Sequence, residues 1–121
     1  MKIPSVDEFR EEARVNNQRD MLSDETRKGM YARWSQKWYF RTWQWWQLRR
    51  LSKELHKNAS KGYSFGAFLY ISSMPYYSHS RYEDEARLYA CQTLCNKIET
   101  LGYQCKCELV DYQACWLDAR T

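Results

Sequence analysis

The sequence predicts an α+β protein in which N-terminal helices lead into a small β-α-β-β sheet unit. Residues 23–57 contain no proline and are rich in good helix formers. Residues 82–101 repeat apolar side chains at helical spacing, whereas residues 103–109 alternate between apolar and polar side chains as a strand does. We therefore expect a helical region over residues 1–61 and the sheet unit over residues 62–121, together in one domain.

Two helical segments are expected before the sheet unit. Ser5 is suited to cap a short acidic helix over residues 5–20. A second, basic helix is expected to begin near Ser23 and to run to about Lys57. Gly29 lies inside this segment, so one long helix and two shorter helices both remain open.

The sheet unit is expected to contain three strands and one helix. Residues 63–71 are apolar on both faces of a strand, which indicates a central strand covered from both sides. The helix over 82–101 follows, and then strands over 103–109 and 112–117. The residues of the second strand that are expected to face the helix are Tyr103, Cys105, Cys107 and Leu109.

Five of the six tryptophans lie between residues 34 and 46, in the most basic part of the chain. Residues 27–61 contain ten Lys or Arg and one acid, a net charge of +9, whereas the whole chain carries +4. On a continuous helix, the longer aromatic stripe is expected to face the chain's own core: Trp34, Trp38, Trp45 and Leu48. The shorter stripe, with an arginine beside it, is expected to face a partner: Tyr39, Trp43, Trp46 and Arg50.

Trp, Tyr and Arg are the residues that dominate protein interfaces. The predicted function is therefore a non-enzymatic protein-interaction module that binds a separate protein or a second copy through its Trp/Arg-rich helix. Interleaved cations and aromatic rings also suit phosphate contacts and base stacking, so nucleic-acid binding is the alternative. Its candidate contacts are Lys37, Arg41, Arg49, Lys53 and Lys57.

No enzyme activity and no cofactor are predicted. His56 and His79 are the only histidines, and neither stands at a recognisable motif spacing from a nucleophile. The five cysteines all lie in the last 31 residues, in C-x3-C and C-x-C spacings followed by a single cysteine. If the helix and strand bring four thiolates together, a zinc site forms from Cys91, Cys95, Cys105 and Cys107. The same positions are those that the apolar periodicity buries, so metal-free core thiols are the favoured interpretation.

The C-terminal half resembles small proteins of tailed bacteriophages in the order of its elements and in several short sequences. The resemblance covers about residues 55–117 and rests on Ala59, Gly62, Tyr63, Ser64, Leu94, Leu101, Gly102, Tyr103 and Trp116. This chain departs from that pattern in having a longer segment over residues 63–82. The resemblance implies a phage source and no chemistry. Together with the interaction helix, a phage source makes a virion or assembly component the expected role, and an inhibitor of a host defence protein is the alternative.

The expected location is the host cytoplasm or an assembled phage particle. No run of apolar residues approaches the roughly 20 that cross a bilayer. The first nine residues also lack the apolar core of a signal peptide. Membrane association and secretion are therefore not expected.

Overall fold

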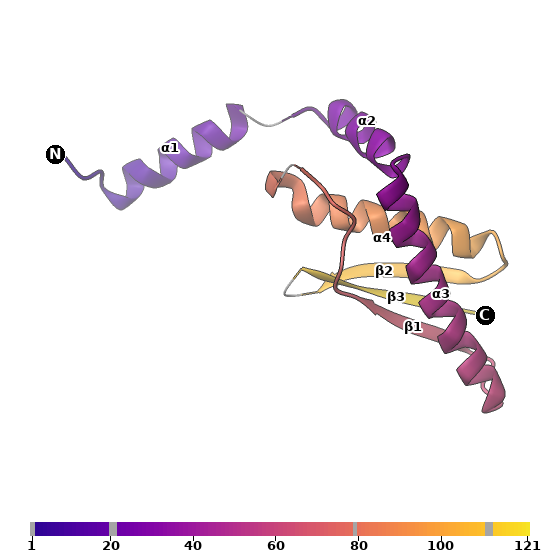
Figure 1. The fold of residues 1–121 in the computed structure, drawn as a ribbon. Coiled ribbons are helices and arrows are strands. Elements are labelled where there is room, and N and C mark those ends of the chain that lie inside the picture. Colours follow the sequence, from indigo (N-terminus) through magenta and orange to yellow (C-terminus); the bar gives the residue numbers. More distant parts are fainter. Residues whose placement is uncertain (1, 20–21, 79, 111–112) are drawn as a thin grey trace. The chain divides into compact units, whose positions relative to one another are not determined.

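The computed structural model describes residues 2–19, 22–78, 80–110 and 113–121 (Figure 1). Its elements are α1 (Val6–Arg19), α2 (Asp24–Ser35), α3 (Trp38–Ser60), β1 (Gly66–Ile71), the 3₁₀ helix η1 (Ser80–Tyr82), α4 (Glu83–Glu99), β2 (Gln104–Val110) and β3 (Ala114–Arg120). The predicted α+β class is confirmed.

The chain forms two compact units, Met1–Met30 and Tyr31–Thr121. Helix α3 packs against β1 and α4, within the second unit. The boundary expected at residue 61 therefore does not separate compact units, because the basic helix forms part of the same core as the sheet.

The first unit contains α1, whose N-terminus is capped as its sequence predicts. The Glu8 backbone N–H donates to Ser5 Oγ at 3.2 Å, and the Ser5 N–H donates to Glu8 Oε2 at 3.4 Å. This reciprocal pair is a capping box, which satisfies two donors that a helix start otherwise leaves without a partner.

The basic segment forms two helices, and the break lies at Gln36 and Lys37 instead of Gly29. The Gln36 N–H donates to the Arg33 carbonyl at 3.2 Å and the Lys37 N–H to the Trp34 carbonyl at 3.1 Å, a tightened last turn. Lys37 is extended, with φ −71° and ψ 147°, and α3 begins at the next residue. The side chains of α3 therefore do not continue the helical periodicity of α2.

The sheet is antiparallel between neighbours, with strand order β1-β3-β2. Because β1 and β2 both run opposite to β3, they are parallel to each other, and β1-α4-β2 is a crossover with β3 inserted between its strands. Strand β1 is therefore an edge strand. The expectation that it is central and covered on both sides is wrong, because α3 and α4 contribute to a single core on one face of the sheet.

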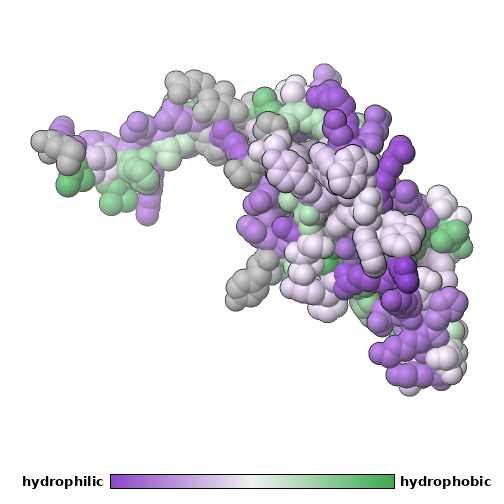
Figure 2. Space-filling view, in the orientation of Figure 1, coloured by the Kyte–Doolittle hydropathy of each residue, from purple (hydrophilic) through white to green (hydrophobic). Residues whose placement is uncertain are grey.

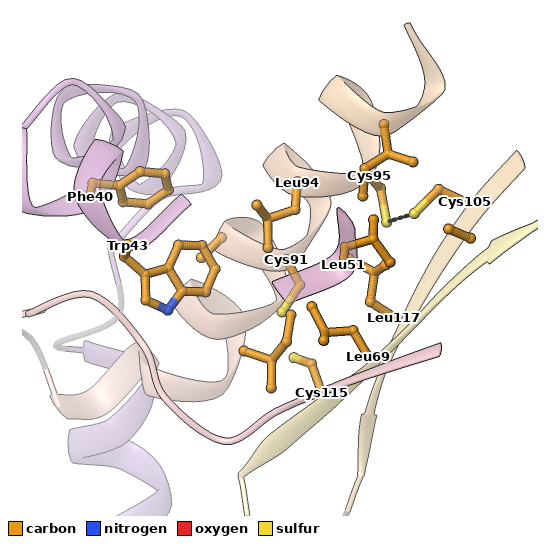
Figure 3. Close-up of a cluster of buried hydrophobic side chains, with 14 of the residues drawn as sticks. Phe40, Trp43, Leu51, Leu69, Cys91, Leu94, Cys95, Cys105, Cys115 and Leu117 are labelled. Carbon is orange, nitrogen blue, oxygen red and sulfur yellow. Dashed lines mark hydrogen bonds between the residues drawn. The ribbon is translucent and has the colours of Figure 1, made fainter. Parts of the chain in front are cut away.

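The core lies between this sheet face and the two helices (Figure 3). Phe40 and Leu51 of α3, Leu94 of α4, and Ile71 and Leu117 of the strands are among its buried side chains. The prediction of which side chains of β2 face the helix is confirmed at the contact between Cys105 and Cys95. Cys105 is buried against Cys95, with Sγ atoms 2.9 Å apart, whereas Lys106 and Glu108 are exposed on the opposite face.

Helix α3 also covers the outer edge of β1. The Asn58 side-chain amide donates to the Gly66 carbonyl at 2.7 Å, and the Arg50 guanidinium donates to the Tyr70 carbonyl at 3.0 Å. These side chains occupy acceptors that an edge strand otherwise leaves open to pairing.

Candidate functional site

Three tryptophans of α3 lie in solvent on the side of the helix away from the core. Trp38 is 76% exposed, Trp45 54% and Trp46 52%. Trp38 and Trp45 are seven residues apart, almost two full turns, so they point in nearly the same direction. Arg49 follows one turn after Trp45 and is also exposed. We call Trp38, Trp45, Trp46 and Arg49 the α3 tryptophan face.

This arrangement corrects the expected division of the aromatic residues. Trp38 and Trp45, expected in the core, are exposed, whereas Trp43, expected to face a partner, is 8% exposed. The buried residues of α3 are instead Phe40, Trp43, Gln44, Gln47 and Leu51. Trp34 and Trp46 lie where they were expected, in the core and in solvent.

Two features of the sequence explain the error. The predicted stripe runs through Gln36 and Lys37, where the structure breaks the helix, so residues before and after the break do not share one periodicity. The buried face of α3 also contains two glutamines, which an apolar pattern does not count. Gln44 Nε2 donates to Thr93 Oγ1 at 2.8 Å and Gln47 Nε2 to Ser73 Oγ at 3.3 Å, so both are buried with partners.

The buried tryptophans have structural roles. Trp34 Nε1 donates to the Tyr76 carbonyl at 2.6 Å, and Trp43 Nε1 donates to the Ser73 carbonyl at 3.3 Å. Both bonds attach the segment after β1 to the helices, and they satisfy the indole N–H groups that burial would otherwise leave unpaired.

The exposed rings of the α3 tryptophan face contact one another. Trp45 and Trp46 pack edge to face, with centroids 5.1 Å apart and an interplanar angle of 78°. The Arg49 guanidinium carbon lies 5.3 Å from the Trp45 ring centroid and 5.8 Å from that of Trp46, within cation–π range of both. These contacts hold the two rings in one arrangement, which lowers the entropy that binding would remove.

The aromatic surface continues past Trp38. Its ring packs edge to face on Tyr39 at 5.7 Å, and Tyr39 packs edge to face on Tyr76 at 6.2 Å. Tyr39, expected to face a partner, is half-buried against the core and links it to the exposed rings. Figure 2 shows pale aromatic side chains over α3, with hydrophilic side chains around them.

The cations proposed for nucleic-acid binding all lie on the solvent side of the chain. The exposed set is Lys37, Arg41, Arg49, Lys53 and Lys57. Arg50, expected to contact a partner, donates instead to Gln47 Oε1 at 2.7 Å and to the Tyr70 carbonyl. Its guanidinium is therefore used within the fold.

The cysteines are free thiols within or beside the core, in two groups. Cys95 lies beside Cys105, and Cys91 beside Cys115. The hydrogen bond between Cys95 and Cys105, together with burial, raises the pKa of Cys95 to about 12. The pKa of Cys91 is raised by its hydrogen bond with Cys115 and by burial. Among the described residues, no group of three or more His, Cys, Asp or Glu side chains is arranged to hold a metal ion.

Two further surfaces were not anticipated from the sequence. The uncovered sheet face carries exposed Phe68, Tyr70 and Trp116, with Tyr70 and Trp116 edge to face at 5.1 Å. A mostly apolar groove of about 760 Å³ lies between the ends of α3 and α4, and exposed His56 is at its margin. The alternation of β1 and β3 shows which side chains share a face, but only the tertiary arrangement shows that this face is uncovered.

Comparison of the chain with protein-family models, with curated proteins and with solved structures found no match in any of the three. Within the described part of the chain, no helix is both long enough and apolar enough to span a membrane.

Proposed function

We propose that this chain is a protein-binding module and that the α3 tryptophan face is its contact surface. One observation carries the proposal: Trp38, Trp45 and Trp46 are exposed together on a helix whose opposite face is already filled by core residues. Tryptophan and arginine are the residues most enriched among those that dominate binding energy at protein interfaces. Burying such rings against a partner removes a large apolar area from water.

The geometry of the rings favours protein over nucleic acid. Base stacking needs an open ring face, and Arg49 lies within cation–π distance of both Trp45 and Trp46, which also pack against each other. A protein surface uses ring edges and total area, which this arrangement leaves accessible. Nucleic-acid binding through Lys37, Arg41, Lys53 and Lys57 is the second candidate, favoured by their exposure near the same rings.

The positive charge of residues 31–53 defines the kind of protein surface that is complementary to the α3 tryptophan face. No acidic residue occurs between Tyr31 and Lys53, whereas Arg41, Arg49 and Lys53 are all exposed. A complementary surface has an apolar or aromatic centre, which covers the tryptophans, and carboxylates at its rim. The rim charges speed association and select against basic surfaces, while the rings supply most of the affinity.

The phage source stays a prediction from the sequence resemblance, and the virion role and the alternative role of host-directed inhibitor stay predictions that combine this source with the interaction helix. A virion component predicts stable assembly into a larger particle, whereas an inhibitor predicts a discrete complex with one host protein.

The test compares proteins that co-purify with the wild-type chain and with a Trp45→Ala/Trp46→Ala variant. We expect a specific protein to bind the wild type and to be lost from the variant. The matched control is Phe68→Ala, which removes an exposed ring on the uncovered sheet face and should leave binding unchanged. If the wild type, Trp45→Ala/Trp46→Ala and Phe68→Ala all recovered the same amount of the bound protein, the assignment of the surface would be overturned.

A second measurement separates the two partner classes. Single-stranded oligonucleotides are titrated against the chain at low salt and at about 0.5 M salt, with tryptophan fluorescence as the readout. The proposal expects weak binding that salt abolishes, whereas the protein complex persists because its core is apolar. Tight oligonucleotide binding that is lost in Trp45→Ala/Trp46→Ala would favour the nucleic-acid function instead.

A further inference from the structure

The two edges of the sheet differ in what covers them. At the outer edge of β1, the side chains of Asn58 and Arg50 donate to backbone carbonyls. At the outer edge of β2, no hydrogen bond from a described residue reaches the backbone of Cys105, Cys107 or Leu109. One edge is thus blocked by α3, and the other is open to pairing.

The hydrogen bonds fix which backbone groups of β2 point outward. Because the Gly66 and Tyr70 carbonyls point toward α3, the alternate residues of β1 are the ones that bond β3. In β3, the residues that lie between those bonded to β1 point their N–H and C=O groups toward β2. Their partners in β2 are Gln104, Lys106, Glu108 and Val110, so the backbone groups of these four residues point toward β3. The outward-pointing residues of β2 are therefore Cys105, Cys107 and Leu109.

We infer that β2 pairs antiparallel with β2 of a second copy of this chain, about a two-fold axis at Cys107. In this register all seven residues from Gln104 to Val110 are paired. Cys107 lies opposite Cys107 of the second copy, and Cys105 lies opposite Leu109. These are the positions whose N–H and C=O groups point outward, so each pair exchanges two backbone hydrogen bonds. The product is a six-stranded sheet with closed two-fold symmetry.

The exposed charges of β2 match this register. Lys106 lies directly opposite Glu108 of the second copy, and the symmetry repeats the pair on the other side of the axis. Both side chains stand on the uncovered face of the sheet and are exposed. Directly opposed charges of opposite sign stabilise a strand pair, whereas like charges destabilise it.

The alternative registers are worse. A shift by one residue sets outward-pointing groups of one strand against inward-pointing groups of the other, which cannot bond. A shift by two residues leaves part of the strand unpaired. It also places Lys106 opposite Lys106 of the second copy, or Glu108 opposite Glu108, depending on its direction. A lysine alone on an edge strand commonly discourages pairing. In β2, Glu108 follows two residues after Lys106, so the strand is complementary to itself in this antiparallel register.

The helix-covered side of the edge is compatible with a second copy. Leu109 is 37% exposed there, and the second copy's Cys105 and neighbouring residues would cover it. Helix α4 packs over both β2 and β3, and Gln92 contacts Cys107 at 3.7 Å through its Oε1 atom. Gln92 and the residues one turn to either side of it, Leu88 and Asn96, are exposed and uncharged, whereas Glu85 and Glu99 toward the helix ends are exposed acids.

The test is a charge swap on the full chain, read by sedimentation equilibrium. We expect a wild-type dimer that is weakened by roughly tenfold or more in Lys106→Glu and in Glu108→Lys, because each places two like-charge pairs across the axis. The double variant Lys106→Glu/Glu108→Lys restores the opposite-charge pairs and should return close to wild-type affinity. Circular dichroism checks that each variant is folded. A monomeric wild type, or a double variant no stronger than the singles, would overturn the inference.

Hydrogen exchange gives a second readout that needs no substitution. In the dimer, the amides of Cys105, Cys107 and Leu109 become protected as concentration rises, while those of Lys106 and Glu108 are protected at every concentration. Unchanged exchange at the three outward positions would contradict the pairing. Trp45→Ala/Trp46→Ala should leave the dimer intact, so failure of this inference and failure of the tryptophan-face proposal are distinguishable. A dimer that this variant abolishes and Lys106→Glu preserves would place the contact on α3 instead.

Discussion

Trp43 and Trp46 stand three residues apart on α3, yet Trp43 is 8% exposed and Trp46 is 52% exposed. Trp43 lies in the core and donates to the Ser73 carbonyl, whereas Trp46 packs edge to face on exposed Trp45 and lies within cation–π range of Arg49. The two indoles thus lie in different environments within one helical turn, and the proposed function assigns the buried one to folding and the exposed one to binding.

Replacing these two residues by alanine should have very different effects on stability. Trp43→Ala removes a buried ring and leaves a cavity, so we expect a loss of about 3–5 kcal/mol in the free energy of unfolding. Trp46→Ala changes an exposed site and should alter it by no more than about 0.5 kcal/mol. Urea denaturation followed by far-UV circular dichroism measures both. Similar losses for the two variants would show that the exposed face also supports the fold.

Arg50 and Asn58 should act on stability through the edge of β1. Asn58→Ala removes the donor to the Gly66 carbonyl, and Arg50→Ala removes the donor to the Tyr70 carbonyl; we expect each to cost about 1 kcal/mol. Lys57→Ala, at an exposed position of the same helix, is the control and should be nearly neutral. If Arg50→Ala weakened partner binding and left stability unchanged, the sequence-based role of Arg50 would be restored.

Two glycines near β1 should differ sharply in their tolerance of a side chain. Gly66 has φ +121°, and a Cβ atom there would overlap the backbone carbonyl oxygen of Ala119 on β3. Gly62 has φ +85° but open space around it. We expect Gly62→Ala to cost about 1 kcal/mol from its backbone conformation alone, and Gly66→Ala to cost several-fold more or to prevent folding. Thermal denaturation of the two variants side by side provides the comparison.

The buried thiols should make stability fall at alkaline pH. Because the folded state raises the pKa of Cys95 to about 12, the folded chain keeps this proton after the unfolded chain has lost it. The stabilisation is fully present below about pH 9, the ordinary thiol pKa, and is lost as the pH rises from there toward 12. Cys95→Ala should flatten the pH dependence of unfolding in that range. A pH dependence identical to that of the wild type would contradict the shifted pKa.

The same cysteines test the metal question. Chelation should leave the melting temperature of the reduced protein unchanged, and the buried thiols should react with a thiol reagent only as fast as the fold opens. Loss of cooperative unfolding after chelation would support the alternative interpretation of the sequence, a zinc site formed by Cys91, Cys95, Cys105 and Cys107.

Local patterns predicted the elements well. The capping pair of Ser5 and Glu8 marks the start of α1, and strict alternation from Tyr103 to Leu109 identifies β2 and its inward face. These features depend on residues close in sequence, whose geometry is set by helix and strand periods. The α+β class follows from them.

The candidate site was predicted only in part, because it depends on tertiary structure. No residue type at Gln36 or Lys37 signals the helix break, so the stripe containing Trp38 and Trp45 was assigned to the wrong side. Burial of Gln44 depends on Thr93 and Lys97 of α4, which a local pattern does not include. Strand order likewise decides that β1 is an edge, and it is set by the long-range pairing of β1 with β3.

The most direct test of the central claim is site-specific photo-crosslinking at Trp45. The residue is replaced by the photoreactive amino acid p-benzoylphenylalanine, and the chain is irradiated in an extract of cells that express it. We predict a discrete adduct with a second protein that survives nuclease treatment and persists at high salt. Phe68 replaced in the same way, on the uncovered sheet face, is the control and should not form this adduct. The account would be contradicted by an adduct that nuclease removes, by equal adducts at both positions, or by none at Trp45.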